Sequence, residues 1–171
     1  SGSADVVGSD NVALQKAADM LKPGDTLAIG VGTYTMDNSV FIPSNVTVRG
    51  TPGKTILLKS AGVASALIED GDYGESQLLV AEPGKFRPGM GITVLDDKQS
   101  SGWDVSVTAV KSIDGNTMMV GPLTVRDYNL EQDHARIQNT FPILCVMDGE
   151  NTVLEDIIVD GNKDQNAHLD G

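Results

Sequence analysis

The sequence predicts a mainly β protein in which short strands stack in parallel, as the turns of a solenoid do. Within 23–58, three short apolar runs occupy 27–29, 40–42 and 46–48. Each is too short for a helix and rich in β-branched residues, and the turns between them contain glycine and leave no room for βαβ crossovers. Aromatic residues make up only 4% of the chain and glycines number 19, which also favours short strands and tight turns over a helical bundle.

An amphipathic helix is predicted at 11–21, before the first strand. Ser9 or Asp10 is a suitable N-cap, and Pro23 with Gly24 ends the helix. We expect this helix to cover the open apolar end of the first strand layer, where the core and an unpaired strand edge would otherwise be exposed. Its apolar residues fall on one face: Val12, Leu14, Ala17, Ala18 and Leu21.

A weak internal repeat supports the stacking. Residues 45–50 (NVTVRG) align with 151–156 (NTVLED), each after a polar turn and before another apolar run. The two copies lie much further apart than the roughly 20 to 30 residues of one solenoid turn. The sequence therefore predicts that a separate module lies between them.

That module is predicted to be an inserted antiparallel β-barrel or sandwich. The segments 86–95, 105–110 and 113–120 read as strands, and the last two flank Asp114-Gly115-Asn116, a strong hairpin signal. Three regions follow: a cap helix and first rungs at 1–70, the module at 71–140, and a resumed rung at 141–171. We expect this last rung to be truncated.

The N-terminal pattern resembles a known family. After the amphipathic helix come PGDTL (23–27), GTYTM (32–36), VFIPSNVTVRG (40–50) and GKTIL (53–57). This order resembles the start of pectate-lyase-like right-handed parallel β-helix proteins, a superfamily that includes polysaccharide lyases, glycoside hydrolases, uronan epimerases and phage tailspikes. The resemblance implies a right-handed parallel β-helix and a polysaccharide or other glycan as partner, but one fold hosts many functions.

Two functions remain open at this point. The first is the N-terminal fragment of a carbohydrate-active lyase, hydrolase or epimerase, inactive by itself because the catalytic motifs of the family's enzymes are absent. The alternative is a non-catalytic carbohydrate-binding or adhesion module of the tailspike kind, or a truncated structural scaffold. Whether the chain is an enzyme is left undecided.

The acidic composition disfavours some classes of binding partner. The net charge is −12, which disfavours nucleic acid because phosphate binding needs clustered Lys and Arg. No apolar run approaches the roughly 18 residues that suggest a membrane span. We expect a secreted, periplasmic or cell-surface protein with no signal peptide in this sequence, and possible self-association through its exposed last rung.

Two places could hold a ligand near the module. Glu69, Asp70 and Asp72 lie among glycines, where carboxylates could bind Ca²⁺ or simply form a solvated turn. No other cofactor is expected. Trp103 lies in a polar, glycine-bearing loop, where it could stack on a sugar or cover the small barrel.

The C-terminal region holds the catalytic candidates. Asp160-Gly161-Asn162 resembles a turn that is common after strands in this family, which suggests a structural Asx turn. Functionally, Lys163 or His168 could act as a general base, and Asp160, Asp164 or Asp170 as acids or Ca²⁺ ligands.

Overall fold

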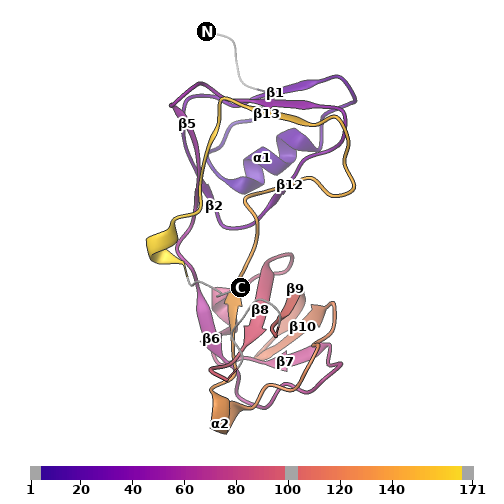
Figure 1. Cartoon of the computed structure of the whole chain (residues 1–171), viewed down its shortest axis with the longest axis vertical. Helices are drawn as coiled ribbons and strands as arrows, with labels where there is room; N and C mark the ends of the chain where they lie inside the picture. The colour runs from indigo at the N-terminus through magenta and orange to yellow at the C-terminus, as the bar shows by residue number, and fades with distance from the viewer. Residues whose placement is uncertain (1–4, 99–103, 167–171) are drawn as a thin grey trace. The chain divides into compact units, whose positions relative to one another are not determined.

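The computed structural model describes residues 5–98 and 104–166 and is mainly β (Figure 1). The chain forms two compact units. Unit 1 comprises 5–61 and 142–165, and unit 2 comprises 62–141 and 166. No helix in the described part is long and apolar enough to cross a membrane.

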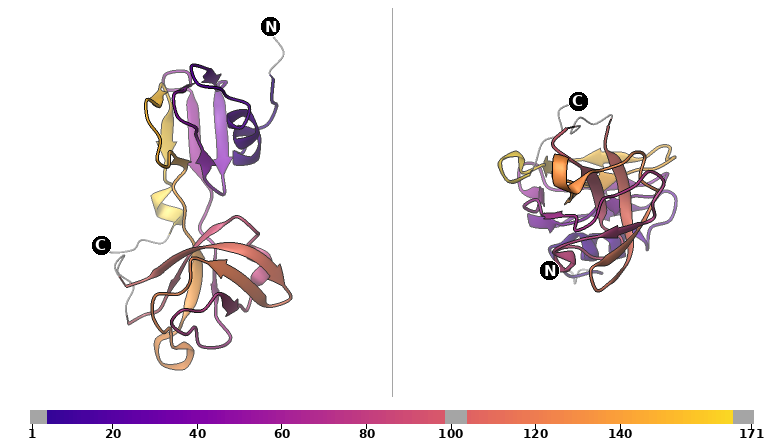
Figure 2. Two further views of the ribbon diagram at one scale, coloured as in Figure 1. Left: turned by 90° about the vertical axis from the view of Figure 1, so that its right-hand side faces the viewer. Right: turned by 90° about the horizontal axis from the view of Figure 1, so that it is seen from below.

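Unit 1 is built from parallel strand pairs. Three small sheets have the strand orders β1-β4-β13, β2-β5-β14 and β3-β12, and every pairing in them is parallel. In Figure 2 the strands β2, β5 and β14 lie side by side. The elements of unit 1 are α1 (Asn11–Ala18), β1 (Thr26–Ala28), β2 (Gly32–Met36), β3 (Val40–Phe41), β4 (Thr47–Arg49), β5 (Thr55–Lys59), β12 (Leu144–Cys145), β13 (Val153–Glu155), β14 (Ile158–Asp160) and a 3₁₀ turn at Lys163–Gln165.

The parallel strands define three layers along the chain. We name β1 and β2 the first layer, β3 to β5 the second layer and β12 to β14 the third layer. In-register apolar side chains stack across them: Leu27 pairs with Val48 and Val48 with Leu154. The second-layer residues Val48 and Leu57 are fully buried within the apolar core of unit 1. The strands β4 and β5 of the second layer are therefore paired on both sides, by a strand of the first layer and a strand of the third.

Helix α1 covers one end of these layers. The Asp10 side chain accepts a hydrogen bond from Ala13 N, which confirms the predicted N-cap. The Gln15 side chain pairs with the backbone of Phe41 in β3, accepting from Phe41 N at 2.8 Å and donating to Phe41 O at 3.2 Å. The helix ends at Ala18 instead of Leu21, because tighter turns take over before Pro23. The Gln15 side chain thus occupies the edge of β3 where another strand could form hydrogen bonds.

Unit 2 is one antiparallel sheet of six strands, in the order β6-β11-β8-β9-β10-β7. The two edge strands meet through a bridge between Leu67 and Val80, so the sheet curls into a partly closed barrel around its own apolar core. Its elements are β6 (Ala64–Ala66), β7 (Gln77–Leu79), a 3₁₀ turn (Pro83–Lys85), β8 (Gly91–Leu95), β9 (Ser106–Asp114), β10 (Thr117–Gly121), α2 (Leu130–Asp133) and β11 (Arg136–Asn139).

The predicted hairpin is confirmed. Strands β9 and β10 pair with Asp114 opposite Thr117, and Gly115 has a positive φ of 56° at the turn. The predicted strand at 86–95 is shorter than expected: β8 starts at Gly91, because Gly89 adopts a φ of 85° in a turn before it.

A buried ion pair holds the chain at one side of the barrel. Both guanidinium NH groups of Arg126 bond the Asp96 carboxylate, at 2.8 and 3.0 Å, and the Asp96 side chain is 1% exposed. The guanidinium also lies 4.1 Å from the centre of the Tyr128 ring. Burial would lower the pKa of Arg126, but the hydrogen bond and charge of Asp96 outweigh it and raise this pKa. The pair therefore fastens the segment around 126 to the end of β8.

Candidate functional site: a groove on unit 2

An open groove of about 510 Å³ lies along β6 and the start of β11. Alanines line part of it: Ala64 and Ala66 on β6, and Ala135 before β11. Small side chains at an edge strand leave room for a flat ligand to approach the sheet closely. The ionisable residues that line the groove are Glu82, Asp97, His134 and Arg136.

Three of these ionisable residues form one cluster. His134 Nδ1 lies 2.8 Å from Asp97 Oδ2, and the Arg136 guanidinium donates to Asp97 Oδ1 at 2.6 Å. The antiparallel pairing of β8 with β11 explains the geometry, because Leu95 lies opposite Arg136 and the same register places Asp97 opposite His134. Asp97 N also donates to Asp133 O at 2.7 Å. The backbone therefore fixes both sides of the cluster.

The electrostatics of the cluster favour an ionised carboxylate. The hydrogen bond from His134, followed by that from Arg136, lowers the pKa of Asp97 below its usual value. The Asp97 side chain is 57% exposed, so it remains open to a ligand. An anionic oxygen beside a guanidinium can accept and orient hydroxyl groups of a polar ligand.

A second pair of charges comes from Lys85 and Glu82, which lines the groove. Lys85 Nζ donates to Glu82 Oε2 at 2.6 Å and to the Ala64 carbonyl at 3.1 Å. Ser65 also lines the groove, but its hydroxyl already bonds Ala66 O and accepts from Glu82 N at 2.9 Å. That hydroxyl holds β6 to the Glu82 turn.

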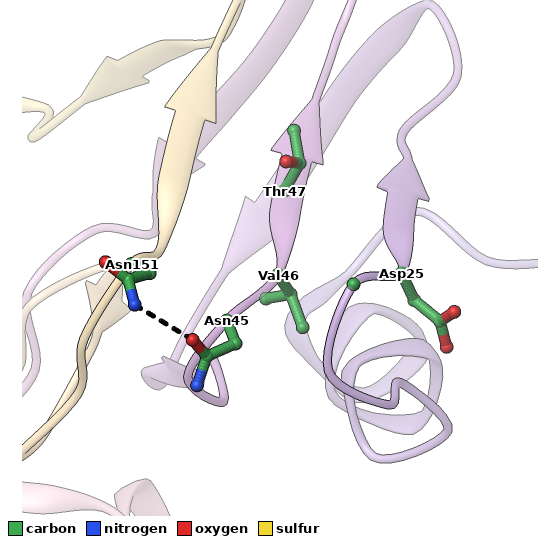
Figure 3. Close-up of a pocket in the computed structure, with 6 residues that line it drawn as sticks. Asp25, Asn45, Val46, Thr47 and Asn151 are labelled. Carbon is green, nitrogen blue, oxygen red and sulfur yellow. Dashed lines mark hydrogen bonds between the residues drawn. The ribbon is translucent and has the colours of Figure 1, made fainter.

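A smaller hollow of about 320 Å³ marks a corner of unit 1 (Figure 3). Here Asn45 and Asn151, which are 106 residues apart in the sequence, stack in successive layers, and Asn151 Nδ2 donates to Asn45 Oδ1 at 3.0 Å. Both adopt left-handed backbone conformations, with φ of 61° and 54°, which asparagine tolerates well. The aligned repeat therefore corresponds to two adjacent corners of unit 1.

Among the carboxylates predicted for calcium, that of Asp70 is engaged with the protein. Asp70 Oδ1 accepts from Leu130 N at 2.7 Å, and the Asp72 carbonyl accepts from the Thr124 hydroxyl. Within 5–98 and 104–166, no group of three or more His, Cys, Asp or Glu side chains is arranged to hold a metal. A calcium site at Glu69, Asp70 and Asp72 stays a prediction.

The C-terminal candidates lie in a turn and a short helix. Asp160 Oδ1 accepts from Asn162 N at 2.8 Å, an Asx turn, and Asn162 Nδ2 donates to the Lys59 carbonyl at 3.0 Å. Lys163 and Asp164 are exposed in the 3₁₀ turn that follows. His168, Asp170 and Trp103 lie outside the described residues. Their proposed roles stay predictions.

Sequence reasoning missed Asp97, His134 and Arg136. One signal was available, since His134 and Arg136 are only two residues apart in the sequence. They lie close to Asp97 because β11 pairs with β8. The sequence of a short apolar strand does not specify which other strand it will pair with.

Comparisons with known proteins give only a coarse likeness. No protein-family model matches the chain, and neither does any curated protein. Among solved structures, the Gp54 tailspike of Acinetobacter baumannii bacteriophage AP22, in complex with A. baumannii capsular saccharide, is 14% identical with a TM-score of 0.43, and the match covers 90% of this chain and 32% of that one.

Two Pseudomonas phage proteins are similar to the chain at the same coarse level. The tailspike gp61 of phage phi297 is 15% identical with a TM-score of 0.41, and the match covers 86% of this chain and 26% of that one. The tailspike gp49 of phage LKA1 is 19% identical with a TM-score of 0.38, covering 86% and 31%. The chain spans about a third or less of the length of these three tailspikes.

Proposed function

We propose that the chain is a non-catalytic, glycan-binding portion of a tailspike-like protein, with the saccharide held in the groove of unit 2. In this proposal the three layers of unit 1 are successive coils of a right-handed parallel β-helix of the pectate-lyase-like kind. Their parallel, in-register stacking supports it. Such a protein would act on a surface outside the cytoplasm.

The groove is the main observation that supports the proposed glycan binding. A sugar ring presents an apolar face and a rim of hydroxyls, and the groove offers alanines beside a fixed carboxylate and guanidinium. Arg136 can donate to ring or hydroxyl oxygens, while Asp97 and Glu82 can accept from hydroxyls.

The proposal is tested by titrating the isotope-labelled chain with neutral oligosaccharides and following backbone amide shifts. We expect shifts grouped on β6, the start of β11 and the turn at Pro83–Lys85. Ala66→Trp should abolish them by filling the groove, whereas Ala61→Trp, at an exposed alanine in unit 1, should not. Arg136→Gln should weaken binding by removing the charged donors while retaining an amide.

Two outcomes contradict the proposal. One is an absence of shifts with every oligosaccharide tested at millimolar concentration. The other is a set of shifts on unit 1 that Ala66→Trp leaves unchanged, since binding would then occur elsewhere on the chain.

A further inference from the structure

The backbone of His134 is unusual for a histidine at the groove of unit 2. His134 follows α2 in a left-handed conformation, with φ of 53° and ψ of 54°. Its N–H closes the helix by donating to Leu130 O at 3.1 Å. Glycine and asparagine are the usual residues at such a helix end, because a larger side chain makes this conformation costly. A strained residue that lines a groove points to a role for its side chain there.

The contact with Asp97 determines which ring nitrogen of His134 carries the hydrogen. An ionised carboxylate can only accept hydrogen bonds, so His134 Nδ1, which lies 2.8 Å from Asp97 Oδ2, is the donor. In the neutral ring Nε2 then has a lone pair and no hydrogen. Nε2 has no partner within 5–98 and 104–166, and the side chain is 74% exposed. The ring therefore offers the groove a hydrogen-bond acceptor.

Arg136 places donors beside this acceptor, because both side chains bond the same carboxylate. Arg136 Nη1 donates to Asp97 Oδ1 at 2.6 Å and to His134 O at 3.3 Å. The Nε and Nη2 groups of Arg136 have no partner among the described residues. Apolar side chains line the same groove: Ala64, Ala66, Leu130 and Ala135. The groove therefore combines an acceptor, adjacent donors and an apolar wall.

We propose that the groove selects sugars that carry an acetamido group. The acetamido N–H donates to His134 Nε2, its carbonyl oxygen accepts from Nε or Nη2 of Arg136, and its methyl group packs on the alanines. A hydroxyl group in the same place has no methyl group and uses fewer of these contacts. The inference rests on the proposed function and adds the class of sugar to it.

The contact with Nε2 requires a neutral His134 ring. Protonation places a hydrogen on Nε2, and the acetamido N–H cannot accept a hydrogen bond from it. Histidine is the side-chain type that ordinarily changes charge between pH 5 and pH 8. The preference for acetamido sugars should therefore weaken as the pH falls through this range. The other ionisable side chains of the groove and of α2 are of different types: Glu82, Lys85, Asp97, Glu131, Asp133 and Arg136.

The test compares a trisaccharide of N-acetylglucosamine with cellotriose, its glucose counterpart, which has a hydroxyl group in place of each acetamido group. Amide shifts of the labelled full chain give both affinities at pH 8 and at pH 5. At pH 8 we expect the acetamido trisaccharide to bind about three- to tenfold more tightly, as one or two additional contacts would give. Most of that preference should be lost at pH 5.

His134→Asn is the matched variant. Asparagine suits the left-handed backbone, but its side chain is too short to reach the position of Nε2. The variant should bind cellotriose as the parent chain does and lose the preference for the acetamido trisaccharide at pH 8. Nitrogen-15 NMR of the parent chain at pH 8 should show the His134 hydrogen on Nδ1.

Three results would overturn the proposal. Equal binding of the two trisaccharides in the groove at pH 8 would exclude acetamido selection and leave the proposed function intact. A preference that persists in His134→Asn, or at pH 5, would show that His134 does not make the selection. An absence of groove shifts with both trisaccharides would contradict the proposed function itself, and this inference with it.

Discussion

Units 1 and 2 bury their strands in different ways, although one chain forms both. In unit 1 the parallel layers cover one another, and α1 covers one end, so Val48 is fully buried and Leu154 is 47% exposed. In unit 2 the edge strands meet at Leu67 and Val80, and the core is enclosed by a single sheet. Stability in unit 1 should therefore vary from layer to layer, whereas unit 2 should behave as one cooperative body.

The largest effect is expected from breaking the buried ion pair of unit 2. Arg126→Ala should destabilise unit 2 by about 3 to 5 kcal/mol, because it removes the bidentate partner of the buried Asp96 carboxylate. Arg49→Ala is the matched control in unit 1. Its ion pair with Glu155 is exposed at the surface and contributes about 0 to 1 kcal/mol. Urea unfolding followed by unit-specific amide exchange measures both, and equal losses would contradict the difference.

An effect of intermediate size is expected when stability losses are compared between two layers of unit 1. Leu57→Ala in the second layer should cost about 2 to 5 kcal/mol, because a fully buried side chain leaves a cavity. Leu154→Ala in the third layer should cost about 1 kcal/mol, since nearly half of that side chain already contacts water. Thermal denaturation of the two variants compares them directly. Similar losses would mean that the third layer is covered in solution.

The smallest effect is a pH dependence confined to unit 2. His134 and Arg136 lower the pKa of Asp97 in the folded protein. The ionised Asp97 therefore stabilises the fold at pH values above its pKa in the unfolded chain, about 3.9. This stabilisation is lost as the pH falls through the pKa of Asp97 in the folded protein. Carbon-13 NMR of the carboxyl should give a midpoint below that value, and His134→Ala should raise it. An unchanged midpoint in that variant would assign the shift to another cause.

Local signals in the sequence predicted part of this fold correctly. The helix at 11–18, its Asp10 cap and the hairpin at Asp114 depend on contacts within a few residues, so the local pattern suffices. The repeat at Asn45 and Asn151 also predicted a true pairing, because stacked layers place like residues in register.

The candidate site could not be predicted in the same way. Asp97 meets His134 only because β11 returns to pair with β8, about 40 residues away in the chain. Likewise, 64–66 was expected to belong to the first rungs, but β6 pairs with β11 in the sheet of unit 2. Both depend on non-local strand pairing, which apolar alternation allows but does not specify.

The side chain of Gln15 makes the two sides of β3 different. By pairing with both the N–H and the carbonyl of Phe41, it removes hydrogen-bonding groups that an added strand at that end would need. Indefinite fibres require that the two ends of a unit can join head to tail. Copies of this chain should therefore be unable to join head to tail through the outer side of β3, the strand that Gln15 blocks.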